Sequence, residues 1–153
     1  ETAPGQNLTF SVVLKDFEIL PKEQIAISQI TALSVVDFLA LHRIEAKIKL
    51  PNDIYVGNKK ICGILIENSI CSNRLRWSIV GIGINVNQTT FPSSLPNPTS
   101  ILLEKSNPEL DLTQQLAKFH EIYSAYYTKY LSSRNESALT EVDYLFKSKL
   151  LSL

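Results

Sequence analysis

The sequence is poor in the residues that build metal sites and disulfide frameworks. It contains two cysteines, Cys62 and Cys71, and two histidines, His42 and His120, and none of them falls in a metal-ligand spacing. A zinc site is therefore not expected. Two unpaired thiols and the lack of a recognisable signal peptide favour a reducing cytoplasm as the location of the protein.

Methionine is missing altogether, even at position 1, where the chain opens with ETAPG. We therefore expect the 153 residues to be a segment of a longer protein. An excess of charge is also lacking, because 15 basic side chains balance 15 acidic ones and no run of Lys or Arg stands out. Binding of nucleic acid requires clustered cations, so it is not expected of this segment.

The sequence has no apolar run that is free of polar interruptions over the length of a membrane span. The longest apolar stretch begins at Pro21 and continues to about Arg43, and Gln24, Ser28 and Asp37 interrupt it. A buried helix of a globular fold is therefore favoured over the rival interpretation, a transmembrane helix.

The remaining pattern is typical of one α/β domain. Strands are expected over residues 7–14, 45–49, 53–56, 60–70 and 76–86, with a tight turn at Gly57-Asn58. Residues 91–107, rich in Pro, Ser and Asn, are expected to form a loop. Asp111 is a predicted N-cap of a helix whose apolar stripe continues to Tyr130, and a last helix is expected near 136–150.

Two short segments combine charged residues with interrupted strands. In KLPND at 49–53, Pro51 must end a strand, which leaves Asn52 and Asp53 where polar side chains can face a ligand. Turn formation alone is also a sufficient explanation. In KICGILIE at 60–67, Lys60 enters an apolar strand that contains Gly63, and an interior glycine often marks the close approach of a ligand. A lysine there can meet a phosphate, although an exposed lysine at a strand end is the simpler interpretation.

A third segment, GIGIN at 81–85, fails both common nucleotide signatures. Val86 stands where a dinucleotide fingerprint requires its third glycine, and the chain has no Walker-type Gly-Lys-Ser/Thr. The segment is a predicted strand in which two positions lack side chains, and it ends in Asn85. The Asn85 amide can both donate and accept hydrogen bonds, as recognition of an adenine edge requires. From the residues alone, a small-molecule site on a sheet is predicted, with a nucleotide as one candidate ligand.

In this order and at these spacings, the three segments resemble the catalytic domain of biotin–protein ligases. The family pattern is Lys-Trp-Pro-Asn-Asp, then Lys-x-x-Gly-Ile-Leu-x-Glu, then Gly-x-Gly-Ile-Asn. The opening Gly5-x-Asn7-Leu8 and the later Thr99-Ser100 are also similar to family segments. The resemblance implies a mixed β-sheet flanked by helices, the biotin–lipoate ligase fold that is shared with class II aminoacyl-tRNA synthetases.

The activity implied by the resemblance has two steps. Biotin and MgATP would give biotinyl-5′-AMP and pyrophosphate, and a lysine of a biotin carboxyl carrier protein, such as that of acetyl-CoA carboxylase, would then receive biotin. ATP, biotin and Mg²⁺ are thus the implied small molecules, and a homodimer is the implied assembly.

The resemblance also implies roles for individual residues. Lys60 resembles the family lysine that contacts the biotin carboxylate and the α-phosphate. Asp53 resembles the acid beside it, which orients the lysine or helps to bind Mg²⁺. The residues implied to bind substrate or ATP are Lys49, Asn52, Gly63, Leu65, Gly81, Ile82, Gly83 and Asn85.

The chain departs from the family pattern in three places. Leu50 replaces the usual Trp of the first motif. The Gly-Arg-Gly-Arg-x-Gly loop expected upstream of Glu1 and the small β-barrel expected downstream of Leu153 are not in the sequence. Residues 1–153 are therefore expected to be the central part of a catalytic domain, and weak or no catalysis is expected of them alone.

Three other functions stay open. A lipoate–protein ligase would use the same kind of lysine on the sheet, although KLPND and KICGIL favour biotin. A non-catalytic adenylate-binding or dimerisation module is a second alternative. A repressor is a third, but the neutral charge gives it no support.

Overall fold

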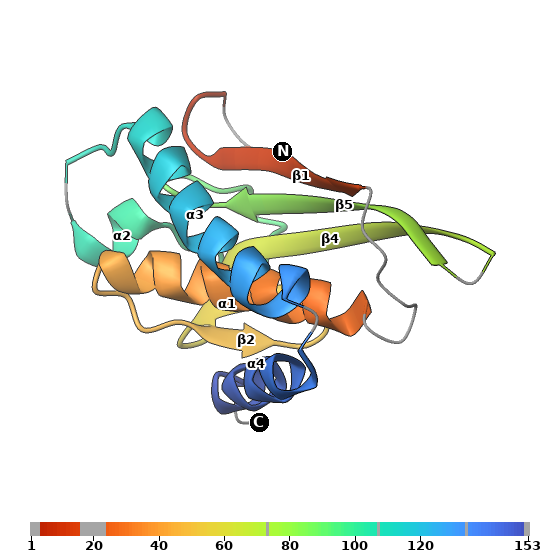
Figure 1. Ribbon diagram of the computed structural model, residues 1–153. Coiled ribbons are helices and arrows are strands. Elements are labelled where there is room, and N and C mark those ends of the chain that lie inside the picture. The colour runs from red at the N-terminus through yellow and green to blue at the C-terminus, as the bar shows by residue number, and fades with distance from the viewer. Residues whose placement is uncertain (1–3, 16–23, 73, 107, 134, 152–153) are drawn as a thin grey trace.

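Five strands form one sheet at the centre of the fold (Figure 1). The structure is a computed structural model that describes residues 4–15, 24–72, 74–106, 108–133 and 135–151. The strands pair antiparallel in the order β1-β5-β4-β3-β2, with the bounds Leu8–Lys15 (β1), Lys47–Lys49 (β2), Asp53–Val56 (β3), Lys59–Cys71 (β4) and Arg74–Ile84 (β5). Two isolated bridges, between Ile48 and Leu150 and between Lys60 and Pro98, run parallel.

Strand alternation gives the sheet one apolar face and one open face. The apolar face carries the branched and aromatic side chains of three neighbouring strands, Leu8, Phe10, Val12, Ile64, Ile66, Val80, Ile82 and Ile84. The open face carries Gly63 and Gly83 at facing positions of β4 and β5, with Thr9 of β1 beside them. The alternation thus separates the core from the surface on which a ligand can lie.

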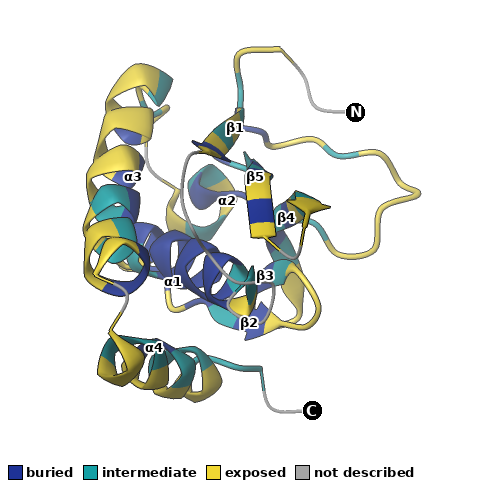
Figure 2. Cartoon of the chain, turned by 45° about the vertical axis from the view of Figure 1, so that its right-hand side comes forward, coloured by how far each residue is buried: buried dark blue, intermediate teal, exposed yellow. Residues whose placement is uncertain are grey.

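The α-helices have the bounds Gln24–Leu41 (α1), Ile101–Lys105 (α2), Leu112–Tyr126 (α3) and Glu136–Ser148 (α4), with a π-helical turn at Tyr127–Ser132 after α3. Of these, α1 and α3 cover the apolar face of the sheet, and α4 packs on α1 (Figure 2). The ring of Phe119 lies 5.2 Å from that of Phe10 and 5.9 Å from that of Phe38, measured between centroids. These edge-to-face contacts join α3, β1 and α1 into one core. The predicted α/β fold of a sheet flanked by helices is confirmed. The sheet was expected to be mixed, but its strands pair antiparallel, and the parallel pairs are confined to the two isolated bridges.

The first helix, α1, is a core helix. Twelve of its 18 residues are buried. Its buried hydroxyls are satisfied within the helix, because Thr31 and Ser34 donate to the carbonyls of Ile27 and Ile30 at 2.6 and 2.7 Å. By length and composition alone α1 could cross a membrane, but 67% of it is buried inside the fold, which supports the predicted core helix. Its predicted start at Pro21 lies outside the described residues.

Two sequence predictions are corrected by the structure. Residues 91–107, predicted as a loop, contain α2, because the Ser100 side chain accepts a hydrogen bond from the Leu103 amide at 3.2 Å and caps a short helix. The strand predicted over 45–49 spans only Lys47–Lys49, since only three of its residues pair with β3.

The predicted turn at Gly57-Asn58 joins β3 to β4 as expected. Gly57 has a φ of 57°, a left-handed conformation that favours glycine. The strand predicted over 76–86 is observed as Arg74–Ile84, because its ladder with β4 extends from Arg74 at the hairpin end to Ile84 opposite Cys62.

Candidate active site

The open face has a floor of bare backbone where β4 and β5 lie side by side. Gly63 lies opposite Gly83, and Leu65 lies opposite Gly81. The nearest atom to a Cβ built at Gly83 would be the carbonyl oxygen of Gly63, at 4.0 Å. The missing side chains therefore leave open space above the strands for a ligand.

A β-bulge turns Lys60 onto this face. The register between β3 and β4 shifts within Lys60–Cys62, which makes Ile61 an extra residue on β4. Ile61 and Cys62 are both buried, so the alternation of β4 is interrupted there. Without the extra residue, Lys60 would share the buried face with Cys62. With it, the Lys60 ammonium lies 3.5 Å from the position that a Cβ of Gly63 would occupy.

Lys60 forms an ion pair with Asp53. The Lys60 Nζ lies 2.5 Å from the Asp53 Oδ1, and the two side chains keep 42% and 25% of their exposure. Solvent-exposed pairs contribute only about 0–1 kcal/mol to stability. The pair is therefore better explained by what it offers to a ligand, an oriented and accessible cation, than by its effect on the fold.

Two cavities meet at this ion pair. One of about 450 Å³ lies over the glycine floor, and one of about 360 Å³ continues toward the proline-rich loop after β5. The residues that border both cavities are Thr9, Asp53, Lys60, Gly63 and Gly83. Because the cation lies where the two cavities join, the site can hold a molecule of two parts with an anionic junction at Lys60.

Comparison with known proteins decides the family. Residues 2–85, more than half of the chain, match the model of the biotin/lipoate A/B protein ligase family. The chain belongs to this family.

Relatives of the chain include ligases from bacteria and plants. It is 35% identical over 111 residues to the bifunctional ligase/repressor BirA of Bacillus spizizenii, with 70% of this chain and 34% of that protein covered. It is 31% identical over 125 residues to the chloroplastic biotin–protein ligase 1 of Arabidopsis thaliana, with 80% and 32% covered. The chain thus spans about a third of the length of the curated relatives it matches.

Solved structures support the same fold. The biotin protein ligase from Aquifex aeolicus in complex with biotin and ATP superposes with a TM-score of 0.76 at 30% identity, covering 97% of this chain and 60% of that one. The predicted biotin–lipoate ligase fold is confirmed by this likeness.

Within this biotin/lipoate ligase family member, nine of the ten predicted site residues border one or both cavities. Leu65 and Gly81 border the first cavity. Ile82 also borders it, although its side chain lies on the buried face between the two glycines and is 2% exposed. Lys49 borders neither cavity, and its ammonium lies over the Tyr55 ring, 4.6 Å from the centroid.

Asn52 and Asn85 each use their amide to hold neighbouring backbone. The Nδ2 of Asn52 donates to the Ile64 carbonyl at 2.8 Å, and the Nδ2 of Asn85 donates to the Thr99 carbonyl at 2.9 Å. Asn52 borders the first cavity and Asn85 the second. Within the described part of the chain their side-chain oxygens accept no hydrogen bond, so these oxygens remain available to a ligand.

Several cavity residues were not predicted from the sequence. Thr9 and Ser11 border the first cavity, and their spacing of two on β1 was the available signal. Phe91 and Leu95 border the second cavity. They are the two large apolar residues in a stretch of Pro, Ser, Thr and Asn, a contrast that a propensity-based loop assignment does not use.

Cys62 lies beneath the site but is not a nucleophile. Its side chain is buried, and its thiol contacts the Gly63 carbonyl at 3.6 Å. Burial raises the pKa of the Cys62 thiol far above its ordinary value, despite the opposing effect of the Lys60 charge. The thiolate that nucleophilic chemistry requires is therefore not formed near neutral pH.

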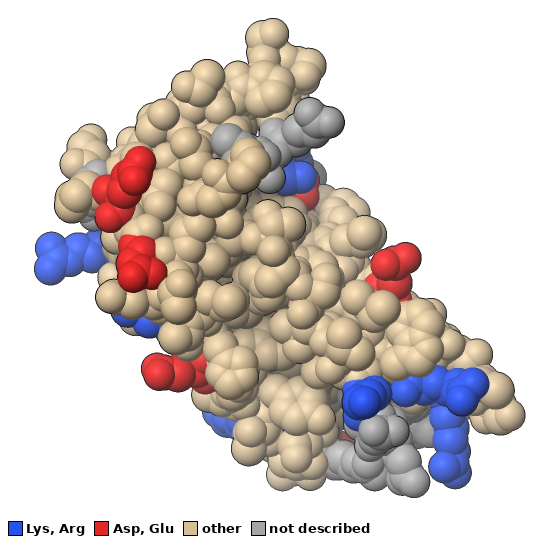
Figure 3. Space-filling view, turned by 90° about the horizontal axis from the view of Figure 1, so that it is seen from above, with Lys and Arg blue, Asp and Glu red and all other residues tan. Residues whose placement is uncertain are grey.

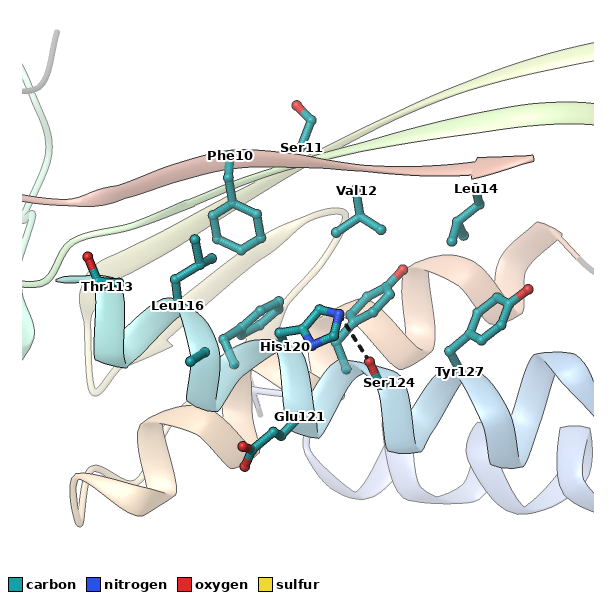
Figure 4. A pocket seen from close by; sticks show the side chains of 13 residues that line it. Phe10, Ser11, Val12, Leu14, Thr113, Leu116, His120, Glu121, Ser124 and Tyr127 are labelled. Atoms are coloured by element: carbon teal, nitrogen blue, oxygen red, sulfur yellow. Dashed lines mark hydrogen bonds between the residues drawn. The ribbon is translucent and has the colours of Figure 1, made fainter.

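A larger hollow lies elsewhere, between β1 and α3 (Figure 4). This groove of about 720 Å³ is mainly apolar, with Phe10, Leu116 and Tyr127 among its lining residues. Two of its polar side chains contact each other, with His120 Nε2 and Ser124 Oγ 3.5 Å apart. Seen from above the view of Figure 1, most of the surface belongs to residues other than Lys, Arg, Asp and Glu (Figure 3). The groove lacks the charged pair that marks the two cavities, so it is not the candidate active site.

Among the described residues that border the two cavities, Asp53 is the single one with a carboxylate. Among the described residues, no three His, Cys, Asp or Glu side chains gather as a metal site. Mg²⁺ is commonly held by one or two carboxylates together with substrate phosphates. The site therefore fits a magnesium ion that arrives with a nucleotide better than a metal held by protein groups alone.

Proposed function

We propose that this chain carries the adenylation site of a biotin–protein ligase. The observation that supports this most directly is the Lys60–Asp53 pair at the junction of two cavities on a glycine floor. The family membership of the chain and its likeness to a ligase solved with biotin and ATP agree with this chemistry.

In the first step, a biotin carboxylate oxygen attacks the α-phosphorus of ATP. The new bond joins the carboxylate oxygen to phosphorus, the bond from the α-phosphorus to its bridging oxygen breaks, and pyrophosphate leaves with the electron pair. Lys60 would neutralise negative charge on the carboxylate and the α-phosphate, which otherwise repel each other. Removal of one such electrostatic contact commonly costs about 10²–10³ in rate.

Asp53 would act by positioning the Lys60 ammonium. Its carboxylate lies on β3 beside Gly63, so it holds Nζ over the glycine floor. Bare backbone at Gly81 and Gly83 would let biotin lie close to the sheet, and Asn85 would offer its amide to the nucleotide in the second cavity. Mg²⁺ would enter as part of the MgATP substrate.

In the second step, the neutral amine of a lysine on a biotin carboxyl carrier protein attacks the acyl carbon of biotinyl-5′-AMP. An amide forms, AMP leaves, and the amine proton passes to solvent. The carrier protein, a homodimeric assembly and a cytoplasmic location belong to this proposal. Their support is the resemblance to biotin–protein ligases and, for the location, two free thiols, Cys62 and Cys71.

Exchange of labelled pyrophosphate into ATP by the full-length protein tests the proposal. The reaction is run with biotin, with lipoate and with neither acid. Exchange that requires biotin and ignores lipoate is the expected result. Exchange with lipoate alone would assign the chain to lipoate ligation. If neither acid supports exchange but calorimetry detects adenylate binding, a non-catalytic binding module would be the correct account.

A further inference from the structure

Lys60 has a second set of partners, on the side of β4 that faces away from β3. The Lys60 amide donates to the Asn97 carbonyl at 2.9 Å, and the Thr99 amide donates to the Lys60 carbonyl at 2.9 Å. Pro98 forms a parallel bridge with Lys60. Residues 97–99 thus take the place beside β4 that β5 leaves after Ile84. The backbone position of Lys60 therefore depends on a strip of chain that belongs to no strand of the sheet.

Besides these backbone bonds and the Asn85 amide, which donates to the Thr99 carbonyl at 2.9 Å, the strip is bound by a carboxylate, that of Glu104. The Thr99 hydroxyl donates to the Glu104 Oε1 at 2.6 Å, and the Lys59 Nζ lies 3.1 Å from the same oxygen. Thr99 is 1% exposed, so its hydroxyl cannot turn to bulk water instead. Glu104 therefore joins the residue before Lys60 to the strip that pairs with Lys60.

The position of Glu104 is fixed by the hydrogen bonds of its helix. This residue lies on α2, whose first turn binds the two residues that follow β5. The Ile101 amide donates to the Asn85 carbonyl at 3.1 Å, and the Leu102 amide donates to the Val86 carbonyl at 2.9 Å. Burial alone would raise the pKa of Glu104, but hydrogen bonds from Thr99 and Lys59 lower it. The group is thus a carboxylate at neutral pH, as the two donors require.

We propose that Glu104 is a positioning residue for Lys60, acting through Thr99 and Lys59. It holds the 97–99 strip against β4. In this way it fixes the position of the Lys60 backbone relative to the place where the two cavities join. It also fixes Pro98, which borders the second cavity. The catalytic part of this inference rests on the proposed function, whereas the structural part does not.

The catalytic part predicts a specific loss in biotin-dependent pyrophosphate exchange. In the full-length protein, Glu104→Ala should lower kcat about ten- to hundredfold, because small misplacement of a catalytic group has effects of this size. The biotin KM should change less than twofold, and rates are normalised to the folded fraction. Glu104→Gln, which keeps an oxygen for the Thr99 hydroxyl, should recover part of the rate. Glu109→Ala, at an exposed carboxylate further along the chain, serves as the control.

Amide hydrogen exchange tests the structural part without any activity. Glu104→Ala should lose protection at the Lys60 and Thr99 amides, while Ile64 on the same strand keeps its protection. Equal protection of these amides in Glu104→Ala and Glu109→Ala would overturn the inference, even in a protein that proves to be no ligase. If the wild type shows biotin-dependent exchange and Glu104→Ala matches the control in kcat, the inference is also overturned, and the proposed function stands.

Discussion

Side chains that are missing are as important to this site as those that are present. Glycines on β4 and β5 form the floor, and Lys60 and Asp53 supply the charge at its centre. Gly83 has no positive φ and no close neighbour, so a side chain at this position would fit the strand and fill only the space of the ligand.

Gly83→Val tests this separation of fold from site. A β-branched residue suits a strand, so the melting temperature should not fall. The new side chain fills part of the cavity over the glycine floor, and biotin-dependent pyrophosphate exchange should therefore drop by about 100-fold or more. Ile79→Val, on the same face of β5 but outside both cavities, should behave as the wild type. A Gly83→Val protein with normal exchange would show that the ligand does not lie over this glycine.

The two cysteines should differ sharply in reactivity. Cys71 is exposed, whereas Cys62 is buried and its thiol pKa is raised by burial. Iodoacetamide at pH 8 should therefore modify Cys71 and spare Cys62 in the folded protein, and it should modify both in denaturant. Mass spectrometry of the digested protein gives the answer. Rapid alkylation of Cys62 under native conditions would contradict the burial of its side chain beneath β4.

Elements, rather than single residues, decide where Lys60 points. The sequence KICGIL predicts a strand, and strict alternation from Gly63 would put Lys60 on the buried face. The bulge at Ile61 instead places Lys60 on the open face, and no local residue preference in the sequence indicates this bulge. The motif could therefore be located from the sequence, but its geometry required the pairing of β3 with β4.

The same limit explains the missed helix α2. Its residues, ILLEK, follow a proline-rich stretch and are too few to show helical periodicity. What stabilises α2 is its cap at Ser100 and its hydrogen bonds to the residues that follow β5, and the latter depend on tertiary structure. The short helix that supports the 97–99 strip could therefore not be predicted from the sequence pattern, whereas the long helices α1 and α3 could.

The α2 carboxylate gives the fold an acid-sensitive contact. The pKa of Glu104 is lower in the folded protein than its ordinary value of 4.5. The contact therefore stabilises the fold above that value and is lost as the pH falls through the folded-state pKa. At pH 7 the wild type should exceed Glu104→Gln in unfolding free energy by about 1 kcal/mol. Denaturant titrations at pH 7 and pH 3 should show this difference shrinking in acid, and a constant difference would contradict it.

At the scale of the whole molecule, the sheet has one apolar face that helices cover and one open face. α1 and α3 fill the first with core side chains, and the proposed chemistry takes place on the second (Figure 2). The family resemblance carried by the three motifs implied a sheet flanked by helices, but the division into a covered face and an open face was not predicted. The second cavity could not be predicted, since residues 91–98 approach β4 only after folding.

The most direct test of the central claim compares Lys60→Ala with Lys118→Ala in biotin-dependent pyrophosphate exchange. Lys118 lies exposed on α3 and borders neither cavity, so the two variants remove the same charge from different places. The account predicts a loss of about 10²–10³ in rate for Lys60→Ala and wild-type exchange for Lys118→Ala. Equal exchange in the two variants would contradict the assignment of Lys60 as the cation of the adenylation site.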